Sequence, residues 1–86
     1  MSNETTKLKA AINKEVSLFI RNKQNKRTEE VPGVLEEVFS RNGMFSHLRF
    51  KKKKGGLSVV LYFYSGDYEI VKIKDIVSKE DIYLSI

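Results

Sequence analysis

The chain consists of short runs rich in β-branched and aromatic residues, separated by sequences that favour tight turns. In the first run, Val16, Leu18 and Ile20 alternate with residues of the other face, which is the pattern of a half-buried strand. Turn sequences recur along the chain about every eight to twelve residues. This spacing predicts a small β-barrel or sandwich.

The pattern predicts six strands, joined by tight turns and by one polar loop over residues 22–30. The clearest turn is Arg41-Asn42-Gly43, because Asn and Gly tolerate positive φ angles. Leu35, Val38 and Phe39 depart from period two, which predicts a bulge or bend in the second strand. The predicted strands are residues 15–21, 31–39, 44–52, 57–64, 68–73 and 81–86.

Alternation also assigns the faces of the later strands. The residues of the third strand that are expected to face the core are Met44, Leu48 and Phe50. The residues of its opposite face are Phe45, His47, Arg49 and Lys51. The fourth strand is apolar on both faces, so it is expected to be central or covered on both sides. Three side chains of the last strand are expected to point inward: Ile82, Leu84 and Ile86.

The two ends of the chain complete the predicted fold. Residues 1–6 are polar and are expected to be disordered, and residues 7–12 have helical spacing of their apolar side chains. Residues 74–79 favour a short 3₁₀ or α turn before the last strand. We therefore expect one mainly β domain over residues 7–86, a small barrel of five to six antiparallel strands with a short N-terminal helix.

Composition excludes several classes of protein. The chain has 86 residues and no cysteine, which excludes disulfides, a zinc ribbon and cysteine-dependent catalysis. A domain of this size without disulfides fits the reducing cytoplasm. The first residues lack the apolar core of a signal peptide, and the longest mainly apolar stretch, residues 57–64, is too short to span a membrane.

Three segments are similar to a known family. They are Lys14-Glu15-Val16, the run Gly33-Val34-Leu35-Glu36-Glu37-Val38-Phe39, and the run Ile73-Lys74-Asp75-Ile76-Val77-Ser78 that leads into Ile82 and Leu84. From about residue 8 onward the chain resembles the Veg family of small Gram-positive bacterial proteins, within the SH3-like and Sm-like barrels. It departs from that family at residues 40–43 and at residues 65–67. The resemblance implies a non-enzymatic domain tied to regulation, and it supplies no site residues.

The net charge of +5 is unevenly distributed, and two basic clusters account for it. The first cluster is Arg49, Lys51, Lys52, Lys53 and Lys54, and the second is Arg21, Lys23, Lys26 and Arg27. Lysine and arginine neutralise phosphates and release counterions, so nucleic acid, RNA or DNA, is the expected partner. If both clusters lie at one end of the barrel, they form a single basic rim. The alternative is that these cations only keep strand edges soluble.

Aromatic residues near basic loops offer a second means of binding nucleic acid, because bases stack on them. Phe19, Phe45, Tyr62 and Tyr64 lie opposite the main apolar sets. Of these, Phe45 and Tyr64 are the candidates for stacking, and Tyr62 is expected to be a core residue whose hydroxyl reaches the edge.

No catalytic site, metal site or cofactor is predicted. His47 is the only histidine, and it has no second His or Cys with which to hold a metal. Glu36 and Glu37 are neighbours on one strand and point to opposite faces. The alternative to nucleic-acid binding is a protein-interaction or regulatory module, whose partner is an acidic protein surface or a second copy of the chain. Its sign would be an exposed apolar strand edge or patch.

Overall fold

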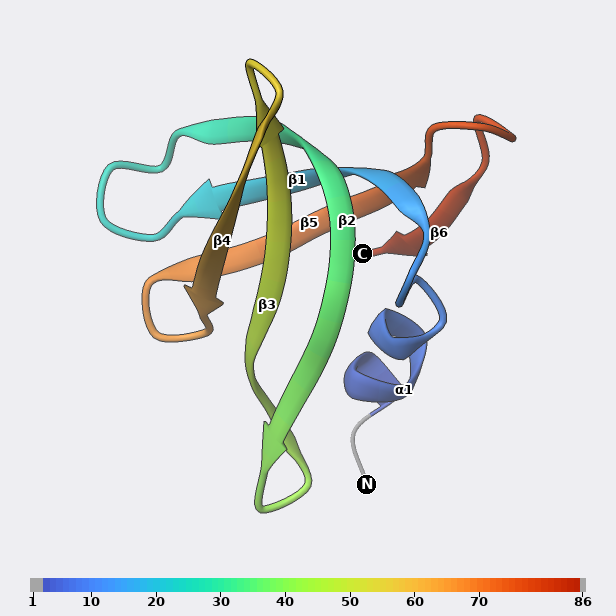
Figure 1. The fold of residues 1–86 in the computed structure, drawn as a ribbon. Helices are drawn as coiled ribbons and strands as arrows, with labels where there is room; N and C mark the ends of the chain where they lie inside the picture. The colour runs from blue at the N-terminus through green and yellow to red at the C-terminus, as the bar shows by residue number, and fades with distance from the viewer. Residues whose placement is uncertain (1–2, 86) are drawn as a thin grey trace.

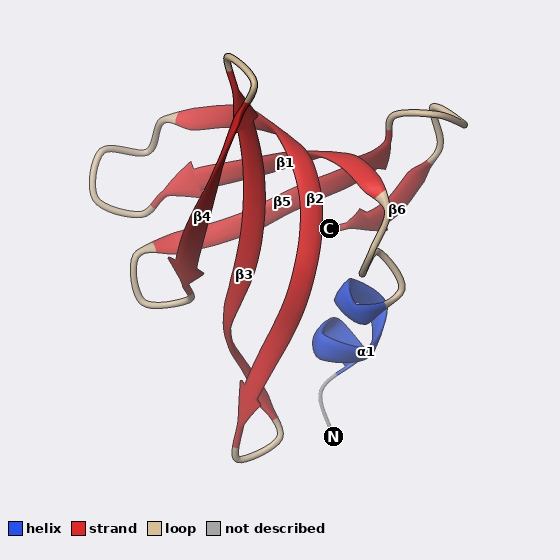
Figure 2. Cartoon of the chain, viewed as in Figure 1, coloured by secondary structure: helices blue, strands red, loops and turns tan. Residues whose placement is uncertain are grey.

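A computed structural model describes residues 3–85, which form a mainly β domain with one short helix and six antiparallel strands (Figures 1 and 2). This confirms the predicted fold class. The elements are α1 (Asn3–Lys9), β1 (Glu15–Asn22), β2 (Thr28–Arg41), β3 (Met44–Lys54), β4 (Leu57–Tyr64), β5 (Tyr68–Asp75) and β6 (Asp81–Leu84).

The strands form one sheet in the order β4-β3-β2-β1-β5-β6. Consecutive strands are neighbours except at one step, where the chain passes from β4 to β5 and β5 pairs with β1. The long strands β2 and β3 bend, so the sheet curls around a single core (Figure 1). Leu18, Leu48 and Phe50 are fully buried in that core, and Leu8 of α1 adds to it. The end strands β4 and β6 each have one strand neighbour among the described residues.

The predicted irregularity in the second strand is confirmed, because the β2–β3 register shifts twice. One shift lies between Leu35 and Glu37 and the other between Phe39 and Ser40. The second shift also moves Phe45 from the expected outer face to the core side, where it packs against buried residues. Met44, which was expected to be in the core, is 69% exposed. A bulge inverts the faces of the residues beyond it, so strict alternation gave the wrong side for both.

The expectation that the fourth strand is central was wrong. β4 is an end strand, and several of its apolar side chains are exposed. Apolar residues on both faces therefore do not show that a strand is central. In the last strand Tyr83 is buried while Leu84 is half exposed, because a register shift in the β5–β6 pairing displaces the expected alternation. Ile86 lies outside the described residues.

The N-terminal helix begins at Asn3, earlier than expected, so residues 3–6 are helical and Thr5 is buried. Before β6, the expected turn is present over residues 76–78, and the Lys79 N–H donates to the Asp75 carbonyl at 2.9 Å. The Asp75 carboxylate accepts from the N–H groups of Val77 and Ser78. This arrangement fixes the direction in which β6 returns along β5.

Candidate nucleic-acid interface

The side of the sheet away from the core carries a partly exposed row of rings and cations on β2, β3 and β4. Antiparallel pairing places His47 between Phe39 and Tyr64, and Arg49 beside Tyr62. Lys51 follows along β3, opposite Val60. We call this surface the outer face, and its residues are Phe39, His47, Arg49, Lys51, Tyr62 and Tyr64.

Four rings of the outer face stack on one another. The centroids of Phe39 and His47 are 4.4 Å apart with an angle of 11° between the ring planes, and those of His47 and Tyr64 are 4.8 Å apart at 27°. Tyr62 lies 6.5 Å from Tyr64. The histidine is further held by Ser46, whose Oγ lies 3.0 Å from Nδ1. Because Tyr62 and Tyr64 are each 49% exposed, both rings are open to a ligand.

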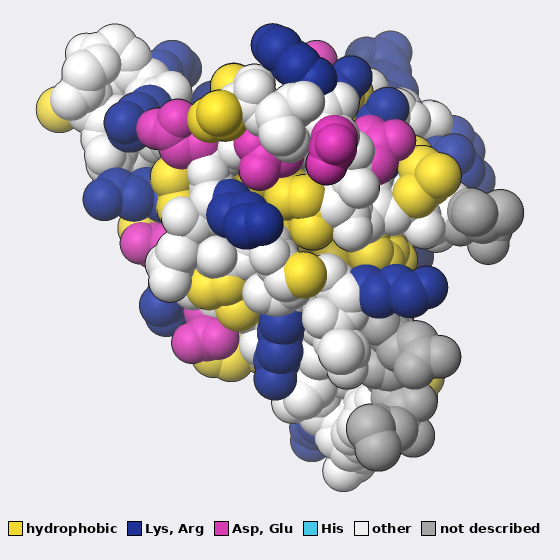
Figure 3. All heavy atoms as spheres, turned by 90° about the vertical axis from the view of Figure 1, so that its right-hand side faces the viewer, with side chains coloured by type: hydrophobic (Ala, Val, Ile, Leu, Met, Phe, Trp, Pro, Cys, Tyr) yellow, Lys and Arg dark blue, Asp and Glu magenta, His cyan; other side chains and the backbone are white. Residues whose placement is uncertain are grey.

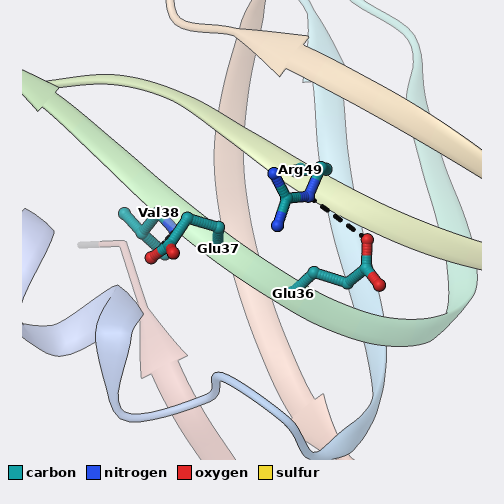
Figure 4. A network of polar contacts seen from close by, with 4 residues as sticks. All are labelled: Glu36, Glu37, Val38 and Arg49. Atoms are coloured by element: carbon teal, nitrogen blue, oxygen red, sulfur yellow. Dashed lines mark hydrogen bonds and ion pairs between the residues drawn. The ribbon is translucent and has the colours of Figure 1, made fainter.

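Arg49 links this aromatic cluster to the acidic residues of the β2 bulge. Its Nε donates to Glu36 Oε1 at 3.3 Å (Figure 4), and its Cζ lies 5.9 Å from the centre of the Phe39 ring. Glu37 points away, and its Oε1 accepts from the Val38 N–H at 3.3 Å (Figure 4). The guanidinium is therefore positioned by one carboxylate and one ring, and its charge is partly balanced.

The two basic clusters do not meet, so the single basic rim is not formed. The β1–β2 loop lies against the β4–β5 turn, where the Lys23 N–H donates to the Asp67 carbonyl and Lys23 Nζ donates to the Ser65 carbonyl. The β3–β4 turn lies at the other end of β4, where Lys53 and Glu15 line the same open pocket. An eight-residue strand separates the two, about 25 Å at roughly 3.3 Å per residue.

The remaining predicted cations occupy separate places. Arg21 forms an exposed ion pair with Glu69 at 3.5 Å. Lys26 and Arg27 are exposed at the β1–β2 loop, and Lys54 is exposed at the β3–β4 turn. Lys52 points to the side of the sheet opposite Lys51 and is half buried. None of these residues belongs to the outer face.

The aromatic residues considered for stacking also lie on different sides of the sheet. Tyr64 lies on the outer face as expected, while Phe45 packs on the core side and its ring is not offered to a ligand. Phe19 is half buried, and Lys72 Nζ lies 4.7 Å from the centre of its ring. Tyr62, which was expected in the core, is half exposed on the outer face.

Phe39 is the outer-face ring that alternation missed, while Tyr62 was placed opposite the main apolar sets but was expected to be a core residue. Tyr62 could have been found, because a two-residue Gly55-Gly56 turn pairs residue 54 with 57 and hence 49 with 62. Phe39 could not, because its partner depends on two bulges whose positions the pattern does not give.

On the side of the molecule that carries α1 and β6, basic and acidic side chains are interspersed, with a row of acidic groups across the upper part (Figure 3). The excess of positive charge is therefore not gathered there. Among residues 3–85, no group of three His, Asp or Glu side chains is placed to hold a metal ion. No helix within the same residues is long and apolar enough to cross a membrane.

No protein-family model, curated protein or solved structure matches this chain. The resemblance to the Veg family therefore stays a prediction.

Proposed function

We propose that the domain binds single-stranded nucleic acid on its outer face. The observation that carries the proposal is the stacked cluster of four rings, two of them half exposed, beside the cations Arg49 and Lys51. Each base stacked on an exposed ring contributes about 1–3 kcal/mol of affinity. The neighbouring cations bind the phosphates between bases.

Single strands fit this surface better than duplexes, because stacking on a protein ring needs a base that is not already stacked in a helix. The described helix, α1, has seven residues and does not lie on the outer face, so it offers no element to enter a major groove.

Few phosphates are contacted in this arrangement. Lys53 lies beyond the outer face, on the same side of β3 as Arg49 and Lys51, and the Glu36 carboxylate already balances part of the Arg49 charge. If Lys53 also contacts the strand, three cations are engaged, and the logarithm of affinity is expected to fall with the logarithm of salt concentration with a slope of about −2, from roughly −0.7 per phosphate on a single strand.

Fluorescence anisotropy with labelled single-stranded and duplex oligonucleotides tests the proposal. We expect binding of single strands at about 50 mM salt, where the electrostatic contribution is strong. Tyr64→Ala and Lys51→Gln should each weaken it, while Lys7→Gln, at an exposed lysine of α1, should not. Absence of binding at that salt concentration ends the proposal.

Finer assignments remain proposals as well. The curled sheet and the turn before β6 support an SH3-like or Sm-like barrel, and the Veg-like segments support a regulatory bacterial protein. The absence of cysteine supports a cytoplasmic location. A protein-interaction module is the second candidate function, because the end strand β4 leaves apolar side chains exposed.

A further inference from the structure

β4 is an end strand without the features that usually protect such strands. It contains no charged residue and no proline, although charged residues make up 31% of the whole chain. Leu57 is 72% exposed and Val60 is 47% exposed. By contrast, the other end strand, β6, has four residues and begins with Asp81. An uncharged, apolar strand with a free edge is suited to pairing with another strand.

The backbone of β4 shows which groups are available. In an antiparallel ladder alternate residues bond the neighbouring strand, and just beyond β4 the Ser65 N–H donates to the Ser46 carbonyl of β3 at 2.9 Å. The odd-numbered residues therefore bond β3. Ser58, Val60 and Tyr62 direct their N–H and C=O groups to the free edge.

We propose that β4 pairs antiparallel with β4 of a second copy of this chain, about a two-fold axis at Leu61. Only residues that share a side of the sheet and point to the free edge can form the new hydrogen-bonded pairs. Pairing about Leu61 meets both conditions over nearly the whole strand. It places Val60 opposite Tyr62 of the second copy, and Ser58 opposite Tyr64 of the second copy, whose carbonyl also accepts from the Asp67 N–H of its own chain at 3.0 Å.

Charge favours a second copy as the occupant, although each chain carries a net charge of +5. The strand itself brings no like charges together, because it has none. The antiparallel register sets the lysines of the β3–β4 turn against the β4–β5 turn of the other copy, where Asp67 is exposed. Lys23 of the β1–β2 loop reaches that turn and donates to the Ser65 carbonyl, and the nearby Arg21 is paired with Glu69.

The dimer joins the two curled sheets edge to edge. The outer faces of both copies then form one continuous surface with two ring clusters, a consequence that rests on the proposed function. The pairing itself is measured without nucleic acid, so the two proposals succeed or fail separately.

Sedimentation equilibrium over a range of protein concentrations tests the pairing. We expect the wild-type chain to approach twice the 9.9 kDa of one copy as concentration rises. Val60→Lys places like charges close together across the axis and should give a monomer at every concentration, with an unchanged circular dichroism spectrum. Val77→Lys is the matched control, since Val77 is 80% exposed in the turn between β5 and β6, and it should behave as the wild type.

The register has its own test. Tyr62→Glu should also give a monomer, whereas Val60→Lys combined with Tyr62→Glu should restore the dimer, because each lysine then faces a glutamate of the other copy. Amide hydrogen exchange should slow at Val60 and Tyr62 as the wild type dimerises. A wild type that remains monomeric, a dimer that survives Val60→Lys, or a double variant that stays monomeric overturns the proposal. Dimerisation that leaves the two amides unprotected overturns it as well.

Discussion

At the scale of single residues, two cations of β3, Arg49 and Lys51, lie on the outer face beside its cluster of four rings. Lys51 and Arg49 follow directly from period two, because no bulge separates them. Phe45 was placed on the wrong side because the register shift next to Ser40 lies between it and Arg49. The sequence shows which residues alternate along a strand. The positions of the bulges decide on which side of the sheet each residue lies.

One consequence at this scale concerns Glu36, which balances part of the Arg49 charge. Glu36→Gln removes a negative charge from beside the outer face, so single-stranded nucleic acid should bind several-fold more tightly at low salt. Anisotropy titrations measure this change. Glu80→Gln removes the same charge from an exposed position before β6 and should have less effect; equal gains from both variants would contradict the placement of the site.

A second consequence concerns Tyr83 and pH. Burial raises the pKa of the Tyr83 phenol from 10.0 to about 12, and its hydrogen bond to Glu4 acts in the same direction. Because the folded pKa exceeds the unfolded one, this contribution to stability is complete below pH 10 and is lost as pH rises to about 12. The wild type should therefore lose on the order of 2 kcal/mol more than Tyr83→Phe over this interval. Urea unfolding of both proteins at several alkaline pH values measures it, and parallel losses would contradict it.

At the scale of elements, the strands and most turns could be predicted because they depend on local sequence. The Gly55-Gly56 turn has φ angles of 57° and 83°, which a tight hairpin of this kind requires. The position of β4 at the end of the sheet could not be predicted, because edge and centre differ in neighbours that are distant in sequence. A strand with apolar residues on both faces, such as β4, can lie at the edge or at the centre of a sheet.

Close packing of β2 on β3 gives a prediction at this scale. A Cβ on Gly33 would lie 2.9 Å from the Phe50 ring and would also collide with the Lys51 carbonyl. Gly33→Ala should therefore destabilise the fold by about 1–3 kcal/mol. Gly66→Ala is the matched control, since a Cβ there meets nothing within 4 Å. Urea unfolding compares the two, and equal stability of both variants would show that β2 and β3 are less tightly packed.

At the scale of the whole molecule, the mainly β fold with a short helix could be predicted from the sequence. Which segments far apart in the sequence lie next to each other could not. The lysines of the β3–β4 turn are separated from the cations of the β1–β2 loop, because β4 runs from the β3–β4 turn to the β4–β5 turn, against which that loop lies. The outer face arises instead from three neighbouring strands, on which Phe39, His47 and Tyr64 lie in one row. The proposed binding surface therefore depends on sheet register more than on net charge.

The most direct measurement of this claim is a nuclear magnetic resonance titration of isotope-labelled protein with a short single-stranded oligonucleotide. We predict that the largest shift changes occur at the side chains and amides of His47, Arg49, Tyr62 and Tyr64, with small changes at Lys26 and Arg27 in the β1–β2 loop. Changes centred on that loop, or no changes on β3 and β4, would contradict the assignment of the outer face as the binding surface.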